Sequence, residues 1–127
     1  MRTIAMLLFC LFILSSCQLN SIQSQTEKLE NSNEKQIFFF SDEENLHKEG
    51  NYYDALLELK KTFPVEIGKM KVISTDDSQM NSKFNIKEYP SILIVYENKV
   101  VKKIQGNITT SEIIIPIEDT LSKINVN

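Results

Sequence analysis

Two apolar runs without polar alternation stand out along the chain. Gln36 to Phe40 reads QIFFF, and Ser91 to Tyr96 reads SILIVY. Strands with no polar face are typical of the centre of a sheet that helices cover on both sides. The pattern therefore predicts a helix-covered sheet rather than an exposed antiparallel one.

Helical spacing follows the first run. Ser41 with Glu44 three residues later fits a capping box, so we expect a helix to begin there. Gly50 interrupts that helix, and a break or kink is expected near it. Beyond it, apolar residues recur at helical spacing until Pro64 ends the pattern, namely Tyr52, Leu56, Leu59 and Phe63.

The remaining pattern completes a small α/β domain. Lys71 to Ser74 reads as a second strand, and the helical crossover before it predicts parallel, right-handed pairing with the first strand. Asp76 to Phe84 predicts a short helix. Ser91 to Tyr96 and Val100 to Ile104 then form a hairpin through Glu97-Asn98-Lys99.

A final helix closes the domain. Thr109 and Glu112 have the spacing of a capping box, and Pro116 predicts that the helix is bent or begins late. Its apolar stripe is Ile113, Ile117, Leu121 and Ile124. The predicted order is β-α-β, short helix, β-β, α.

The N-terminus carries an export signal. After Met1-Arg2, the apolar run from Ile4 to Leu14 has the length of a signal-peptide core and is too short to span a bilayer. It ends in Leu14-Ser15-Ser16-Cys17, which resembles the bacterial lipobox. The alternative is an ordinary signal peptide with a cysteine at its cleavage site. The resemblance implies a lipoprotein signal peptide over residues 1–16 and acylation of Cys17 with palmitate-type chains.

Three regions follow from this assignment. Acylated Cys17 would anchor the protein at the extracytoplasmic face of the cell membrane, because several acyl chains suffice for stable attachment. Residues 17–35 lack aromatic residues and are predicted to form a flexible tether. A helix from Thr26 to Lys35 that packs on the domain is the alternative. The folded domain is predicted over residues 36–127.

Charge and cysteine content exclude several functions. The 127 residues contain 14 basic and 17 acidic side chains, a net charge of -3, with no basic stripe for a phosphate backbone. Nucleic acid is therefore not an expected partner. The two cysteines, Cys10 and Cys17, both precede the domain, which excludes a disulfide framework or a cysteine metal cluster within it.

The second half of the chain resembles the thioredoxin fold. Tyr89-Pro90 stands directly before an apolar strand, a hairpin follows, and Gly106 precedes the last helix. In thioredoxins this arrangement surrounds a cis-proline loop. The resemblance covers about residues 36 to 124 and implies a cis peptide bond before Pro90 and a central four-stranded mixed sheet flanked by helices.

The chain departs from that family where thioredoxins carry their chemistry. A Cys-x-x-Cys normally opens the first helix, whereas Ser41 to His47 reads SDEENLH. Without those cysteines we expect no thiol-disulfide exchange, no enzyme activity, no catalytic residue and no cofactor.

Other catalytic or metal-binding readings of this segment are weaker. His47 with Glu43 or Glu44 would form a metal or acid-base site, but the chain offers no second histidine or usable cysteine as a zinc ligand. A Ser41-His47-Asp42 triad lacks an oxyanion hole. Glu43 and Glu44, adjacent on a helix, point in different directions and favour the helix start instead. We therefore expect no metal site.

An aromatic surface is the best candidate for function. In the thioredoxin fold the first helix and the cis-proline loop share one surface that binds extended peptide, which would place Tyr53 beside Tyr89 and Pro90, with Tyr52 nearby. The alternative is that Tyr52 belongs to the core and that Tyr53 and Tyr89 are ordinary, partly exposed aromatic residues.

Two functional hypotheses follow. The first is a redox-inactive binding module of the cell envelope that captures a protein or peptide. The second is a structural, peptidoglycan-associated lipoprotein, because small lipoproteins of Bacillus relatives with a similar plan carry that label.

Overall fold

The fold is α/β, with a four-stranded mixed sheet between helices. The computed structural model describes residues 34–125. Its elements are β1 (Gln36–Ser41), the 3-10 helix η2 (Glu43–Lys48), α2 (Gly50–Thr62), α3 (Pro64–Gly68), β2 (Lys71–Ser74), α4 (Ser78–Lys83), β3 (Ser91–Tyr96), β4 (Lys99–Gln105) and α5 (Thr110–Asn125).

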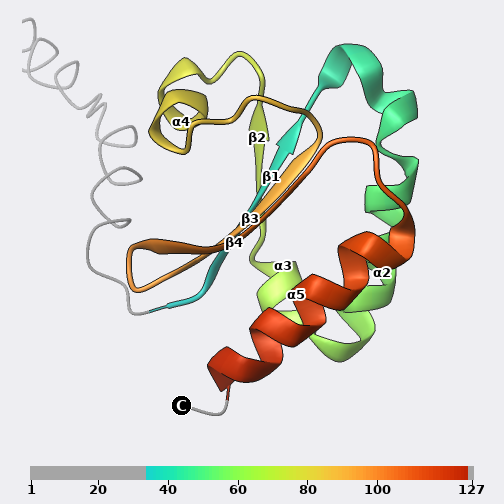
Figure 1. Cartoon of the computed structure of the whole chain (residues 1–127), viewed down its shortest axis with the longest axis vertical. Helices are drawn as coiled ribbons and strands as arrows, with labels where there is room; N and C mark the ends of the chain where they lie inside the picture. Colours follow the sequence, from blue (N-terminus) through green and yellow to red (C-terminus); the bar gives the residue numbers. More distant parts are fainter. Residues whose placement is uncertain (1–33, 126–127) are drawn as a thin grey trace, which may run out of the picture. The chain divides into compact units, whose positions relative to one another are not determined.

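The strands follow the spatial order β2-β1-β3-β4 (Figure 1). The β1–β2 pair is parallel, and β1–β3 and β3–β4 are antiparallel. This topology confirms the predicted parallel crossover and the predicted hairpin. It also leaves β2 and β4 as the two edge strands among the residues that the structure describes.

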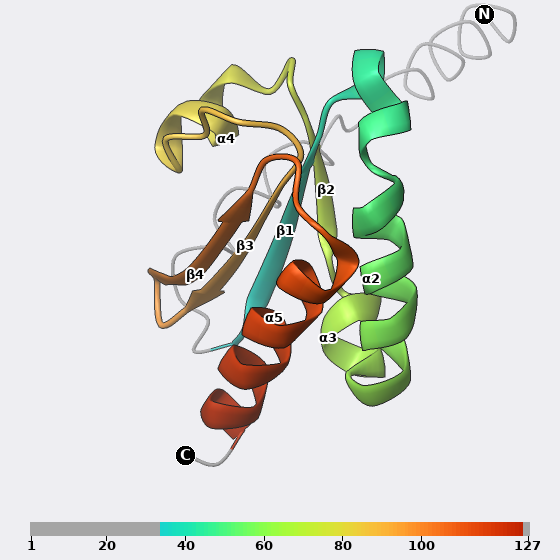
Figure 2. The same cartoon turned by 45° about the vertical axis from the view of Figure 1, so that its right-hand side comes forward.

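Alternate residues of β1 serve the two faces of the sheet. Ile37 and Phe39 belong to the main core with residues of α2 and α5. Phe38 and Phe40 face the other way, where both rings contact the ring of Phe84 at the end of α4. Figures 1 and 2 accordingly show α2 and α5 on one side of the sheet and α4 on the other. Helical cover on both sides explains why β1 lacks a polar alternation.

The apolar stripes of both long helices are buried as predicted. Tyr52, Leu56 and Leu59 of α2 are core residues, followed by Phe63 directly after the helix. In α5 the buried residues are Ile113, Ile117 and Leu121, and Ile124 packs against the core from its edge.

The first helical segment differs from the prediction at its start. Ser41 is not a helix cap, because the parallel register with β2 continues to the pair Ser41↔Ser74. Asp42 is the N-cap instead, and its carboxylate accepts a hydrogen bond from the Glu44 backbone N–H. The segment is a 3-10 helix that ends at Lys48, and α2 begins at Gly50, so the predicted break is confirmed.

Two prolines act differently from the expected pattern. Pro64 ends α2 but also starts the short helix α3, which the sequence pattern did not predict. A proline in the first turn loses no hydrogen bond, because the first N–H groups of a helix have no partner within it. Pro116 lies inside α5, which nevertheless begins at Thr110, so the proline does not delay the start of the helix.

The capping box before α5 is formed as predicted. The Glu112 carboxylate accepts hydrogen bonds from the backbone N–H and the hydroxyl of Thr109, and the Glu112 N–H donates to the Thr109 hydroxyl oxygen. These bonds to the charged form lower the pKa of Glu112. The contribution of this carboxylate to stability is therefore present above its ordinary pKa and is lost as the pH falls through the lowered value.

Replacing the cap residue tests its contribution. We expect Thr109→Ala to lower the free energy of unfolding by about 1 kcal/mol. The Glu112 backbone N–H loses the hydroxyl oxygen that accepts from it, and the Glu112 carboxylate loses the hydroxyl that donates to it. Urea unfolding of the full-length lipoprotein in detergent, followed by far-ultraviolet circular dichroism, measures the change. Thr62→Ala, at the exposed end of α2, is the control, and an equal loss in both variants would contradict the role of the cap.

Candidate functional site

The candidate site lies where β1 ends and α2 begins. At this end of the sheet the chain passes from Ser41 through the 3-10 helix to Glu49, and the loop before β3 arrives beside it, since Ser91 pairs with Phe40 (Figure 2). The peptide bond between Tyr89 and Pro90 is cis, as the thioredoxin resemblance implied.

A buried glutamate organises this end of the sheet. Glu49 is fully buried, and its carboxylate accepts hydrogen bonds from three groups. The Ser41 hydroxyl donates at 2.8 Å, the Asp42 N–H at 2.7 Å and the Tyr53 hydroxyl at 2.7 Å. These bonds join β1, the turn after it and the first turn of α2. Glu49 therefore fixes the position of both chain segments that form the site.

Tyr53 is held in place at both ends of its side chain. Its hydroxyl donates to Glu49, and its ring packs edge-on against Phe39 with centroids 5.8 Å apart. The hydrogen bond to Glu49, followed by burial and the negative charge of that residue, raises the pKa of Tyr53. The side chain is still 45% exposed. Tyr53 thus presents an aromatic surface with a fixed orientation.

Tyr89 is held by a different helix. Its hydroxyl hydrogen-bonds to the side-chain carbonyl of Asn81 in α4. Partial burial, and then the charge of Asp42, raises the pKa of Tyr89, which places this tyrosine within the electrostatic reach of the turn after β1. Tyr53 belongs to α2 and is bonded to Glu49, whereas Tyr89 lies in the loop before β3 and is bonded to Asn81 of α4.

Pro90, expected at the binding surface, is buried, whereas Tyr89 before it is partly exposed. The Pro90 carbonyl accepts the Gly106 N–H at 3.0 Å, and the Tyr52 hydroxyl donates to the Gly106 carbonyl at 2.7 Å. Gly106 has a φ of +87°, a backbone conformation that residues with a Cβ rarely adopt, so glycine is favoured there. Tyr52 is a core residue, which confirms for this residue the alternative given in the sequence analysis.

His47 lies outside this arrangement. It stands exposed in the last turn of the 3-10 helix. Between residues 34 and 125 there is no group of three or more His, Cys, Asp or Glu side chains placed to hold a metal ion. Ser41 donates its hydroxyl to Glu49 and not to a histidine, so the Ser41-His47-Asp42 triad is not assembled.

An apolar groove runs from this site along the edge of the sheet. It has a volume of about 400 Å³ and lies between α2, the loop after α3, and β2. Tyr53 and Leu57 of α2 line one side and Met70 and Val72 the other, with Lys60 at the rim. Leu57 and Val72 are 67% and 63% exposed, so two large apolar side chains of the groove are accessible to solvent.

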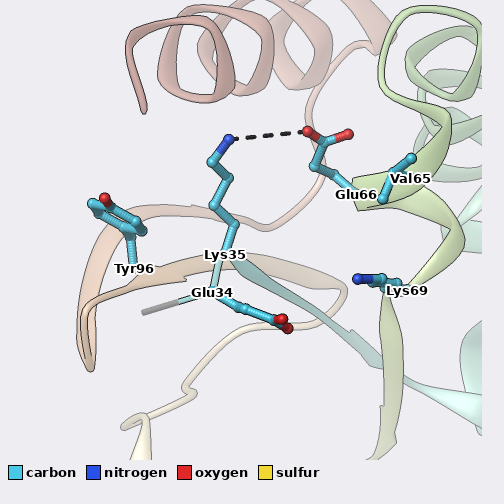
Figure 3. A pocket seen from close by; sticks show the side chains of 6 residues that line it. All are labelled: Glu34, Lys35, Val65, Glu66, Lys69 and Tyr96. Atoms are coloured by element: carbon cyan, nitrogen blue, oxygen red, sulfur yellow. Dashed lines mark ion pairs between the residues drawn. The ribbon is translucent and has the colours of Figure 1, made fainter. Parts of the chain in front are cut away.

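A second, more polar hollow of about 320 Å³ lies at the opposite end of the sheet, where β1 starts (Figure 3). Lys35 reaches from the start of β1 towards Glu66 of α3, with 4.0 Å between Nζ and Oε1, and Tyr96 stands to one side. Of the charged residues that line it, Lys35 and Glu66 form an ion pair. Among residues 34–125, none of the candidate site residues that the sequence predicted lines this hollow.

A comparison with curated proteins decides the family. The chain is 38% identical over 124 residues to the Pal-related lipoprotein of Bacillus subtilis strain 168, and the match covers 96% of this chain and 98% of the relative. The chain belongs to the Pal-related lipoprotein family. No protein-family model matches it.

The fold of this Pal-related lipoprotein is thioredoxin-like, as predicted. Thioredoxin 1 of Thermosipho africanus TCF52B superposes with a TM-score of 0.54 at 20% identity, covering 71% of this chain and 98% of that one. Thioredoxin 2 of Pseudomonas aeruginosa PAO1 gives a TM-score of 0.57 at 12% identity, covering 76% and 88%. The thioredoxin of Malassezia sympodialis gives 0.57 at 11%, covering 76% and 80%.

Family membership makes the protein a lipoprotein and thus membrane-associated. Within residues 34–125, no helix has the length and apolar character needed to cross a bilayer. The signal peptide, the lipobox and Cys17 lie outside the described residues, as does most of the tether. Their boundaries, and the acylation of Cys17, stay predictions from the sequence.

Glu49 is the important residue that sequence reasoning missed. Its position directly before Gly50 marks it only as a residue at a helix break, and acidic residues are common at such positions. Its burial depends on Ser41 and Tyr53 converging from two elements. Only the three-dimensional arrangement shows that contact.

Proposed function

We propose that this protein is a redox-inactive binding module, anchored by acylated Cys17 at the extracytoplasmic face of the membrane, that captures a protein or peptide of the cell envelope. The ligand would bind at the end of β1, on the surface formed by Tyr53 and Tyr89 above Pro90. No cofactor or metal takes part in this function. The family and the thioredoxin-like fold support the proposal.

One observation carries the proposal. Tyr53 and Tyr89 are both partly exposed, while their hydroxyls are bonded to Glu49 and Asn81. Rings that are already oriented lose little conformational entropy when a ligand covers them. Tyrosine is also the residue type that protein interfaces favour, because it offers a large apolar surface with a polar tip.

Crosslinking in cells tests this surface. The full-length lipoprotein is crosslinked in the envelope, the wall is digested with muramidase, and the attached material is identified by mass spectrometry. We expect the Tyr53→Ala/Tyr89→Ala variant to lose at least about nine-tenths of a specific protein crosslink. Each tyrosine supplies on the order of 1 to 2 kcal/mol at an interface, which together exceeds a tenfold loss of affinity.

Tyr96→Ala provides the matched control. Tyr96 is also a partly exposed tyrosine, but it lies at the end of β3 that pairs near the start of β1, away from the site. The variant should capture the partner as the natural protein does. Unchanged capture by a folded Tyr53→Ala/Tyr89→Ala variant would show that the surface is not the binding site.

A structural role at the cell wall is the second candidate. It rests on the name of the relative, a Pal-related lipoprotein, and on the label that similar small lipoproteins of Bacillus relatives carry. Sedimentation of the detergent-solubilised full-length protein with purified sacculi tests it. Co-sedimentation at low salt, together with glycan fragments and no protein in the crosslinking experiment, would favour this role over the binding module.

A further inference from the structure

Among residues 34–125, no strand pairs with the outer edge of β2. In the described part of the chain β2 has only β1 as a neighbour, so its other edge presents backbone N–H and C=O groups without a strand to pair with (Figure 1). Asn81 covers only the last carbonyl, that of Ser74, with its side-chain amide at 3.0 Å. An open strand edge pairs with an extended peptide when side chains nearby favour it.

The two faces of this edge differ in chemistry. Val72 pairs with Phe39 and therefore lies on the face covered by α2, beside the apolar groove. Lys71 pairs with Phe38 and lies on the opposite face, because successive residues of a strand point to opposite sides. A strand added to β2 would thus meet an apolar surface on one face and a lysine on the other.

The groove beside Val72 is built to receive apolar side chains. Tyr53, Leu57 and Lys60 of α2 have the spacing of residues on one helix face, and all three line the groove. The side chain of Leu57 is 67% exposed and that of Val72 63% exposed. No acidic residue lines the groove, and its one charged side chain is the lysine at its rim.

We propose that the edge of β2 binds, by β-strand addition, an extended peptide segment of another protein that alternates apolar and acidic side chains. The apolar side chains enter the groove between Leu57 and Val72. The acidic ones lie beside Lys71 on the other face, and Lys60 adds attraction at the rim. Lysine on an edge strand discourages pairing with arbitrary strands, so the acidic residues of the partner supply the selectivity.

This site is separate from the surface at Tyr89. It lies at the edge strand β2 and not at the end of the central strand β1, and only Tyr53 belongs to both. The proposal therefore does not depend on the proposed function of the aromatic surface. Tyr89→Ala should leave peptide binding at β2 unchanged, so the failure of one proposal can be told from the failure of the other.

A labelled peptide tests the chemistry directly. The probe is a capped, fluorescein-labelled heptapeptide that alternates glutamate with valine, and its anisotropy is measured with the full-length lipoprotein in neutral detergent. A peptide with lysine in place of glutamate is the comparison. We expect the glutamate peptide to bind at least about tenfold more tightly, and less so at high salt. Equal binding of both peptides, or binding of neither, would overturn the proposal.

Charge reversal locates the site. Lys60→Glu/Lys71→Glu should weaken binding of the glutamate peptide at least about tenfold and should reverse the preference in favour of the lysine peptide. Lys61→Glu is the matched control, because Lys61 is the exposed neighbour of Lys60 and pairs with Glu58 at 2.7 Å outside the groove. An equal effect of the control variant would show only a response to net charge and would overturn the proposal.

The apolar half of the proposal has its own pair of variants. Leu57→Asp should weaken binding about tenfold or more. Ile115→Asp is the control and should leave binding unchanged. Both residues are apolar helix residues of similar exposure, 67% for Leu57 and 65% for Ile115. Circular dichroism confirms that each variant folds. Binding that survives Leu57→Asp would overturn the groove as the site.

Hydrogen exchange then distinguishes the occupant. The peptide should slow amide exchange in residues 71–73 and leave the amides of the other edge strand, β4, unchanged. Slow exchange there without peptide, in a monomeric protein, would mean that another segment of this chain already covers the edge. Loss of a dimer in the Leu57→Asp variant, measured by sedimentation velocity, would instead identify a second copy as the occupant. Either result would overturn the proposal.

Discussion

Glu49→Ala is expected to lower the free energy of unfolding by about 3 kcal/mol, a large part of the stability of so small a domain. The variant removes the acceptor for the Ser41 hydroxyl, the Asp42 N–H and the Tyr53 hydroxyl at once. Each of these three hydrogen bonds contributes about 1 kcal/mol. Urea unfolding of the full-length lipoprotein in detergent, followed by circular dichroism, measures the loss.

Two further variants separate the cause from a general effect of losing an acid. Glu58→Ala removes an exposed glutamate of α2 that forms an ion pair with Lys61, and it should cost less than about 1 kcal/mol. Glu49→Gln keeps one carbonyl acceptor and should lie between the two. A Glu49→Ala protein within about 1 kcal/mol of the natural chain would show that the carboxylate does not hold the site together.

Tyr52 is expected to make the protein sensitive to alkaline pH. Burial, and then the charge of Glu88, raises the pKa of Tyr52 to about 12, from an ordinary value of 10.0. Between these values the unfolded chain loses the phenolic proton and the folded protein keeps it, so stability falls as the pH rises. The two-unit difference corresponds to about 2 to 3 kcal/mol lost between pH 10 and 12.

The Tyr52→Phe variant isolates this effect from the titration of the lysines. At neutral pH it should be about 1 kcal/mol less stable, because the Gly106 carbonyl loses the hydroxyl that donates to it at 2.7 Å. Above pH 10 the gap should close and then reverse, since phenylalanine does not titrate. A constant difference between the two proteins from pH 7 to 12 would contradict the role of Tyr52. Tyr96→Phe is the control.

The pattern of apolar and polar residues predicted most of the fold, because most of the strands and helices are encoded by residues that are close together in the sequence. The apolar runs of β1 and β3 predicted buried strands, and the capping box of Thr109 with Glu112 formed as the spacing indicated. The cis bond before Pro90 and the place of Gly106 came from the resemblance to thioredoxins and not from pattern alone. The sequence did not predict α3, because a helix of five residues is too short to show a helical repeat of apolar residues.

The candidate site was predictable only in part. Tyr53 and Tyr89 stood out as aromatic residues near a helix start and a proline loop; the structure bonds them to Glu49 and Asn81, and their joint binding surface stays a prediction. The error at Ser41 has a physical reason: a serine before acidic residues has the local signature of a helix cap, but pairing with β2 keeps it in the strand. Its hydroxyl is then free to bond to Glu49.

The amino-acid sequence by itself predicted the export signal and the lipid anchor, and it determined the absence of cysteine from the domain and most of the order of the elements, because each depends on neighbouring residues or on composition. Only the tertiary structure decided that Glu49 is buried among three donors, that Tyr53 bonds to Glu49 and Tyr89 to Asn81, and that β2 is an edge strand of the described residues with an apolar and a basic side. Those features arise from contacts between segments distant along the chain, and sheet packing and register bring them together.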